Sequence, residues 1–183
     1  MELIKYYNQD GDYVKTLERN HPSSKELWYN IVVGLIVNLK FRKLYLQLDT
    51  ENNLQLTAGG HVQCDEESNE AIAREILEET GINVGDCELL NTFTYKCYSK
   101  NQFHKYYIYN ADITLNSFQI KDKKEVLTFI ELDIDELLNQ AGCIGKDVEG
   151  IKKSLNYYEV VKAFNGEYVL YQICNIIKNL PSV

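Results

Sequence analysis

The chain has 183 residues, of which 45% are hydrophobic and 25% are charged, and its formal net charge is −8. These values are typical of a globular protein and exclude a disordered chain. The acidic balance excludes a protein that binds nucleic acid non-specifically through its overall charge. We expect a single domain over residues 1–183, because domains of this size are common.

Neither a membrane protein nor a disulfide-rich protein is expected. The longest apolar run, residues 31–37, is much shorter than the roughly 18 residues that a membrane helix needs. The start of the sequence lacks the cationic and apolar segments of a signal peptide. The five cysteines include no CxxC pair, which argues against a disulfide framework or a zinc ribbon. We therefore expect a cytoplasmic protein with reduced thiols.

The first part of the chain predicts strands. Residues 3–7 and 13–17 flank a turn-rich cluster, so we expect an N-terminal β-hairpin over about 1–20. Residues 29–38 are rich in Val and Ile and predict a strand buried on both faces. Residues 44–48 alternate leucine with other side chains, which predicts a neighbouring strand.

A helix with clear boundaries follows. The pattern predicts a helix over residues 68–80, with Ser68 or Asn69 as its N-cap. Gly81 is well placed to end this helix, because glycine adopts the left-handed conformation at little cost.

The second half of the chain alternates between strands and helices. Residues 88–95, 104–113 and 125–132 predict strands, and Asp133 or Asp135 can cap a helix that runs to residue 140.

Two apolar stripes at helical spacing predict further helices over about 148–164 and 168–180, which together form a C-terminal helical extension over about 147–180. These helices could cover the sheet or form a homodimer surface. The alternation of strands and helices predicts an α/β (α+β) fold.

Three acidic residues of the predicted helix stand out. Glu75, Glu78 and Glu79 occupy positions i, i+3 and i+4 and therefore share one helical face. Like charges at this spacing repel one another unless a cation neutralises them. A cluster of carboxylates behind a glycine turn suits a hard divalent cation such as Mg²⁺. The alternative is an acidic face that simply points into water.

The surrounding residues favour the metal site. Gly60 is followed by five residues and Glu66, then by seven residues and Arg74. The segment then continues as Arg-Glu-Ile-Leu-Glu-Glu-Thr-Gly-Ile up to residue 82. This pattern resembles the Nudix hydrolase signature without a gap or substitution. A chance match of its seven fixed positions at one place is on the order of one in a hundred million.

The resemblance implies a fold, an activity and a cofactor. Nudix domains are α/β/α sandwiches with a mixed sheet, in which the signature forms a loop, a helix and a second loop. The family typically hydrolyses a nucleoside diphosphate linked to another moiety, and it uses Mg²⁺ or Mn²⁺. The substrate is thus expected to be a small-molecule diphosphate.

The resemblance also implies roles for individual residues. Glu78 and Glu79 match the principal metal ligands, and Glu75 matches a glutamate that ligates metal or positions water. Arg74 matches the arginine that orients this glutamate, and the backbone carbonyl of Gly59 matches a further ligand. Glu66 matches a glutamate that supports the loop.

Other candidates lie outside the signature or at its edge. Glu125, at the start of a strand, is a candidate metal ligand or base, and the alternative is an ordinary surface glutamate. His61 could contact a phosphate or simply stabilise the turn. Tyr95 and Tyr107 are weak candidates for stacking on a base, and the alternative is packing within the sheet.

Softer motifs in the first 62 residues resemble the isopentenyl-diphosphate isomerase-like subgroup of the family. An isomerase is therefore an alternative, but Gly59 stands where the isomerase needs a cysteine, and Cys64 lies five residues further on. A third alternative is a Nudix domain that binds a nucleotide without turnover.

Overall fold

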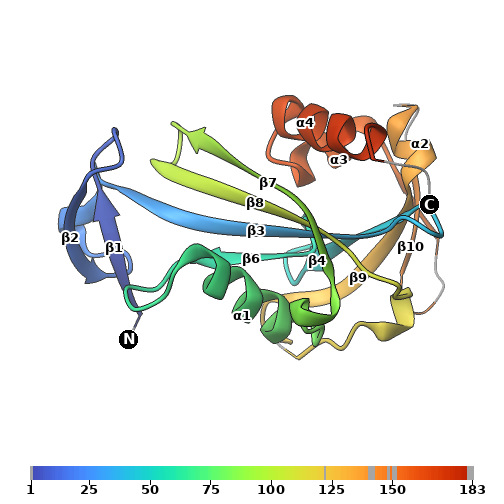
Figure 1. Ribbon diagram of the computed structural model, residues 1–183, viewed down its shortest axis with the longest axis horizontal. Coiled ribbons are helices and arrows are strands. Elements are labelled where there is room, and N and C mark those ends of the chain that lie inside the picture. The colour runs from blue at the N-terminus through green and yellow to red at the C-terminus, as the bar shows by residue number, and fades with distance from the viewer. Residues whose placement is uncertain (1, 122, 140–142, 148, 150–151, 181–183) are drawn as a thin grey trace.

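The structure is a mixed β-sheet with helices on both faces, which confirms the predicted α/β/α sandwich (Figure 1). The computed structural model describes residues 2–121, 123–139, 143–147, 149 and 152–180. The helices are α1 (Ser68–Thr80), α2 (Ile134–Leu138), α3 (Tyr157–Ala163) and α4 (Glu167–Lys178). The strands are β1 (Leu3–Tyr7), β2 (Tyr13–Glu18), β3 (Trp28–Asn38), β4 (Lys43–Asp49), β5 (Leu54–Gln55), β6 (Ala58–His61), β7 (Glu88–Cys97), β8 (Gln102–Asn110), β9 (Val126–Asp133), β10 (Cys143–Asp147) and β11 (Lys152–Leu155).

Strand β3 organises the sheet. One edge of β3 pairs in parallel with β8, from Tyr29 opposite Gln102 to Val37 opposite Asn110. The other edge pairs antiparallel with β1, β6 and β4 in turn. Both edges and both faces are therefore covered, which explains the continuous apolar run of the strand.

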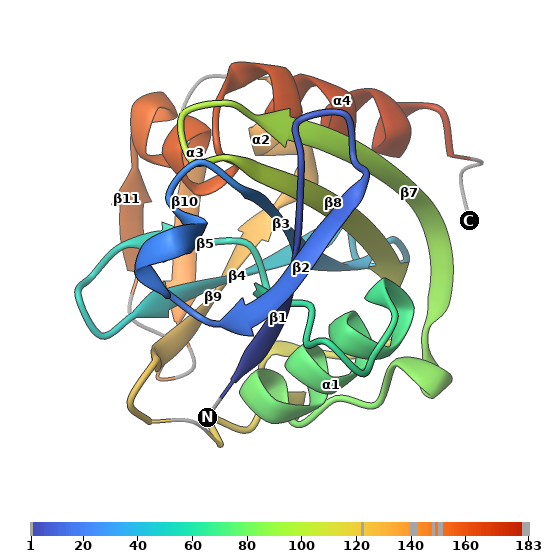
Figure 2. The ribbon, with the colours of Figure 1, turned by 90° about the vertical axis from the view of Figure 1, so that its left-hand side faces the viewer.

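Two hydrophobic cores lie on opposite faces of β3. Val33 and Leu35 belong to the core beneath α3 and α4, whereas Val32 and Ile36 belong to the core above α1. Helix α1 lies on one side of the sheet, and helices α3 and α4 lie on the other, in both views (Figure 1, Figure 2). Helix α1 buries the apolar side chains of Ala71, Ile72 and Ile76. Helices α3 and α4 bury those of Val160, Ala163, Val169, Leu170, Ile173 and Ile177.

Helix α1 has the predicted boundaries, but its N-cap differs from the prediction. The cap is Glu67 rather than Ser68 or Asn69, and Glu67 forms a reciprocal capping box with Glu70. A capping box satisfies two backbone amides at once, so the glutamate pair outcompetes a single hydroxyl or amide. Gly81, at φ 76°, ends the helix as predicted.

The C-terminal region corrects the predicted helix over 148–164. Lys152–Leu155 form strand β11 instead, which pairs with β10 to extend the sheet beyond β9. Helix α3 begins only after Asn156, whose side chain accepts a hydrogen bond from the Glu159 amide at 3.0 Å. The helix predicted to reach residue 140 ends at Leu138, and residue 140 lies outside the described residues. No helix in the described part of the chain is long and apolar enough to cross a membrane.

A buried threonine joins β3 and β4, and its removal is expected to weaken the fold. The Thr57 hydroxyl accepts from the Ile36 amide at 2.9 Å and donates to the Tyr45 carbonyl. Thr57→Val leaves both backbone groups without a partner, so we expect a loss of about 1–3 kcal/mol in the free energy of unfolding. Urea denaturation measures this loss, and Thr94→Val, at an exposed threonine, is the control. Equal stability of the two variants would contradict this assignment.

Candidate active site

A cavity of about 420 Å³ brings the acidic candidates together. Helix α1 contributes Glu75, Glu78 and Glu79, and Glu125 reaches the cavity from the segment before β9. All of the predicted metal and catalytic residues line this cavity: Gly59, Arg74, Glu75, Glu78, Glu79 and Glu125, together with His61. We name it the carboxylate cavity.

The three helix carboxylates differ in their exposure to solvent. The Glu79 residue is only 4% exposed, and the side chain of Glu75 is 13% exposed, whereas that of Glu78 is 58% exposed. Helix α1 therefore directs the Glu79 carboxylate into the protein interior and the Glu78 carboxylate toward solvent. An acidic face that simply points into water does not account for Glu79.

Glu79 is an unusual buried acid. Its Oε2 atom is buried and has no hydrogen-bond partner among the described residues. Burial raises the pKa of Glu79 to about 8, and the charge of Glu75 adds to this rise. The Gln47 side chain and the Gly59 amide act in the opposite direction by stabilising the charged form. A buried carboxylate oxygen that accepts no hydrogen bond has lone pairs available to bind a cation.

Arg74 connects α1 to the end of β6 and to the loop that follows it, residues 62–67. Its Nε and Nη2 atoms donate to the two carboxylate oxygens of Glu66 at 3.0 and 2.6 Å, and Nη2 also donates to the His61 carbonyl at 3.1 Å. Burial by itself would raise the pKa of Glu66, but hydrogen bonds from Arg74 and from the Gln63 amide hold it below its usual value. The guanidinium thus holds the loop in a fixed position beside the helix.

The same guanidinium holds two of the metal candidates. Its Nη1 atom donates to Glu75 at 2.9 Å and to Glu78 at 3.2 Å. Burial raises the pKa of Glu75, and the charge of Arg74 opposes this rise. The contact with Glu75 is the one that an orienting arginine requires.

Gly60 leaves space that Glu75 occupies. A Cβ atom at residue 60 would lie 2.0 Å from Oε1 of Glu75, and one at residue 59 would lie 2.9 Å from the backbone carbonyl of Val32. We expect Gly60→Ala to displace the Glu75 carboxylate and to lower kcat by about 100-fold, because small misplacements of a reacting group are costly. Steady-state hydrolysis and thermal melting measure the two effects.

The neighbouring glycine provides the comparison for this prediction. A flexible side chain can move away from a new methyl group, whereas backbone cannot, so Gly59→Ala should mainly lower the melting temperature. Unchanged kcat in Gly60→Ala would contradict the close packing of Glu75 at this glycine.

The donor set fits a hard divalent cation. Within the described residues, no three acidic, histidine or cysteine side chains already converge on one point, and Arg74 donates to Glu75 and Glu78. All the candidate ligands are oxygen atoms, and Mg²⁺ keeps several water ligands, so it needs few direct protein contacts. The unpartnered oxygen of Glu79 is the most suitable first contact.

His61 lies at the edge of the cavity. Its ring stacks on Tyr29 with centroids 5.3 Å apart, and Nδ1 is 4.0 Å from Oε1 of Glu2. Burial, assisted by the charge of Arg19, lowers the pKa of His61 to about 4. The imidazole is therefore neutral at pH 7.

The two tyrosine candidates lie elsewhere. The Tyr95 ring packs 5.8 Å from that of Tyr168 on α4. Tyr107 is 3% exposed and stacks on Tyr109 in the core above α1. Neither is among the residues that line the carboxylate cavity.

Sequence reasoning missed several polar residues of this region, among them Gln47 and Arg19. Gln47 is buried next to Glu79, and Arg19 lines the cavity from the end of β2. A glutamine between leucines on a buried strand is a signal that could have identified Gln47. The position of Arg19 depends on the packing of the hairpin, which the local sequence does not reveal.

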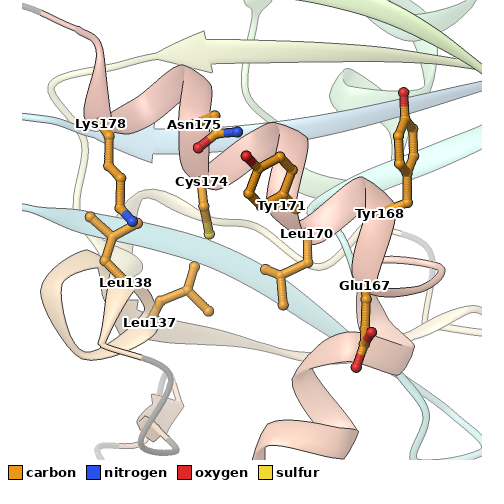
Figure 3. A pocket seen from close by; sticks show the side chains of 9 residues that line it. All are labelled: Leu137, Leu138, Glu167, Tyr168, Leu170, Tyr171, Cys174, Asn175 and Lys178. Carbon is orange, nitrogen blue, oxygen red and sulfur yellow. The ribbon is translucent and has the colours of Figure 1, made fainter.

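Another cavity, of about 410 Å³, lies between α2 and α4 (Figure 3). Leu137 of α2 and Cys174 of α4 line it, and its charged residues, Glu167 and Lys178, lie at opposite ends of α4. Burial raises the pKa of the Cys174 thiol, which makes it a poor nucleophile. This surface carries no recognisable chemistry, and the possible homodimer stays a prediction.

Comparisons with known proteins agree with the fold and the motif. The family model described as "NUDIX domain" matches residues 28–148, which is more than half of the chain. The crystal structure of DR0079 from Deinococcus radiodurans is similar with a TM-score of 0.61 and 21% identity, over 75% of this chain and 87% of that chain.

Two further structures show weaker likeness. An Ap4A hydrolase of C. elegans has a TM-score of 0.49 and 14% identity over 82% of this chain and 93% of its own. A MutT NUDIX hydrolase of Burkholderia pseudomallei has a TM-score of 0.48 and 17% identity over 79% of this chain and 97% of its own. A search of curated proteins gives no significant match. The isomerase-like subgroup is not confirmed and stays a prediction, whereas the chain itself belongs to the Nudix family, whose hydrolases act on diphosphate bonds.

Proposed function

We propose that the protein is a Mg²⁺- or Mn²⁺-dependent pyrophosphohydrolase that cleaves a nucleoside diphosphate linked to another moiety. The observation that carries this proposal is the buried, unpartnered Oε2 of Glu79 in a cavity that also contains three other candidate carboxylates. Such a site is costly without a cation and favourable with one, because buried charges require partners.

The residues of the chain have distinct roles in the proposed reaction. Glu75, Glu78, Glu79 and Glu125 would hold the cation together with the Gly59 carbonyl. Arg74 orients Glu75 through the 2.9 Å hydrogen bond, and Glu75 holds the attacking water and accepts its proton. When it is bound, the cation neutralises phosphate charge and favours deprotonation of water.

A product assay tests the proposal. Purified protein is incubated with Mg²⁺, with Mn²⁺ or with a chelator, and with nucleoside triphosphates, sugar nucleotides, dinucleotides, coenzyme A and isopentenyl diphosphate. We expect metal-dependent cleavage of a diphosphate bridge in at least one compound. Glu51→Gln, which changes an exposed glutamate outside the cavity, should cleave like the wild type.

The alternatives predict other products. An isomerase would move the double bond of isopentenyl diphosphate without releasing phosphate, and a binding domain would bind a nucleotide without turnover. Gly59 in place of the cysteine that an isomerase needs favours hydrolysis. Cys64 does not replace that cysteine, because it is not among the residues lining the carboxylate cavity.

A further inference from the structure

A second cavity, of about 500 Å³, adjoins the carboxylate cavity. The two share Arg19, Gly59, Gly60 and His61, so a molecule can extend from one into the other. A diphosphate held at the carboxylates would therefore place one of its two substituents in this second cavity.

Three cations surround the second cavity, which we name the cationic cavity. Arg19 follows β2, Lys100 lies in the turn between β7 and β8, and Lys162 lies on α3. No carboxylate occurs among the described residues that line it. In a chain with 27 acidic and 19 basic residues, this wall has the opposite charge to the molecule as a whole. Such a wall attracts and concentrates anions.

The two lysines are available to a ligand. Lys162 donates only a long hydrogen bond of 3.4 Å to Oδ1 of Asn53. Arg19, in contrast, already forms an ion pair with Glu2 at 3.2 Å. Among the described residues, neither Lys100 nor Lys162 forms an ion pair. Lysine acts as a mobile point charge that binds phosphate well, so an added phosphate would supply the missing counter-charge.

The same cavity lacks a surface on which a nucleobase could stack. Its described lining includes no Phe, Tyr or Trp, and the His61 ring already stacks on Tyr29. His104 is 4% exposed, and its Nε2 is 2.7 Å from Oε1 of Gln102. Stacking is worth about 1–3 kcal/mol per base in nucleic-acid sites, and this cavity does not provide it. The side-chain amide nitrogens of Asn53 and Gln55 donate to Asp49, which leaves their oxygen atoms to accept hydrogen bonds from the hydroxyl groups of a ligand.

We propose that the cationic cavity binds a phosphorylated polyol, so that the substrate carries a phosphate ester in addition to the diphosphate that is cleaved. The inference rests on the proposed function, because the carboxylate cavity supplies the position of the diphosphate. The nucleoside then lies on the other side of the diphosphate, outside the cationic cavity.

Calorimetric titration of the metal-free protein tests binding without turnover. The probes are fructose 1,6-bisphosphate, which is a polyol with two phosphates, and adenosine, which offers a base and no phosphate. We expect the bisphosphate to bind and adenosine not to bind. Lys100→Gln combined with Lys162→Gln should weaken bisphosphate binding at least about tenfold, which corresponds to about 1.4 kcal/mol.

Matched variants separate the cavity from general charge. Lys121→Gln combined with Lys178→Gln also removes two exposed charges, both outside the cationic cavity, and should bind like the wild type. Unchanged melting temperatures verify that the variants fold. The inference is overturned if the bisphosphate does not bind, if the double variant binds it as the wild type does, or if adenosine binds equally well.

An activity measurement distinguishes this inference from the proposed function. We expect kcat/KM for ADP-ribose 1″-phosphate to exceed that for ADP-ribose at least about tenfold in the wild type, and the ratio to approach one in the double variant. Metal-dependent cleavage with no such preference would overturn the inference alone. Bisphosphate binding that depends on the lysines, without any cleavage across the panel, would overturn the proposed function alone.

Discussion

Glu79→Gln is expected to reduce metal-dependent hydrolysis roughly 100- to 1,000-fold while making the metal-free protein more stable. The activity falls because a buried carboxylate that holds the cation becomes neutral, and charge stabilisation at such sites is worth several kcal/mol. The stability rises because the substitution removes a buried acid that has an unpartnered oxygen and a pKa raised to about 8. Sites built for function often reduce stability in this way.

The stability effect has a defined dependence on pH. The pKa of Glu79 is about 8 in the folded protein and 4.5 in the reference state, so ionisation of this carboxyl costs stability. The cost is absent below about pH 4.5, grows as the pH rises, and is complete above about pH 8. The melting temperature of Glu79→Gln in chelator should therefore exceed that of the wild type increasingly across this window, by about 2–4 °C for each kcal/mol regained.

Two results would contradict the role assigned to Glu79. Full activity in Glu79→Gln would show that the carboxylate does not hold the cation. Lower activity together with a lower melting temperature at pH 8 would show that its role is structural. Glu51→Gln, measured in parallel, should change neither quantity.

Among the substitutions proposed for this protein, Arg74→Gln is expected to cause the largest decrease in the free energy of unfolding. Arg74 contacts Glu66, Glu75 and Glu78, and the side chains of Glu66 and Glu75 are only 14% and 13% exposed. Removal of one partner from such a network leaves partly buried charges without compensation, at a cost of about 2–4 kcal/mol. Urea denaturation measures this cost, and the same variant should also lose most of its kcat because Glu75 is no longer oriented.

Two further variants identify the cause. Arg74→Lys keeps the charge but cannot form the paired hydrogen bonds to Glu66, so it should lose less stability than Arg74→Gln and still have a reduced kcat. Arg42→Gln breaks an ion pair with Asp135 whose side chains are 43% and 60% exposed, and it should cost less than about 1 kcal/mol. Equal losses in Arg42→Gln and Arg74→Gln would contradict a special role for the Arg74 network.

The sequence predicts α1 well because local signals agree there. Apolar periodicity, a glycine at the end and the spacing of the glutamates all lie within a few residues of one another. The cap was predicted incorrectly, because the pair Glu67 and Glu70 acts together and neither is a typical cap alone. The β10–β11 hairpin was missed because it is stabilised by the edge of β9, which is distant in sequence from β11.

The site shows the same division between local and distant information. The signature identifies Glu75, Glu78 and Glu79 because one helix carries all three. Successive side chains of a strand point to opposite faces of the sheet, so Tyr106 and Tyr107 of β8 lie in opposite cores. The local sequence does not reveal which of the two faces which core. The cationic cavity joins Arg19, Lys100 and Lys162 from three separate segments, and no local pattern predicts that they meet.

The parallel pairing of β3 with β8 has a consequence for the order of folding. Residues 39–101 must form a closed loop before this pairing exists, and closing such a loop costs entropy that a local hairpin does not pay. Helix α1 and strand β6 lie within this loop, and β6 pairs with β3 across a shorter stretch of chain, so β6 and the helix can form from contacts nearer in the chain. The turn at Lys100 takes its place beside Arg19 only when the loop closes. We therefore expect Glu75, Glu78 and Glu79 to belong to a unit that can form before the β3–β8 pairing, whereas the cationic cavity requires that pairing.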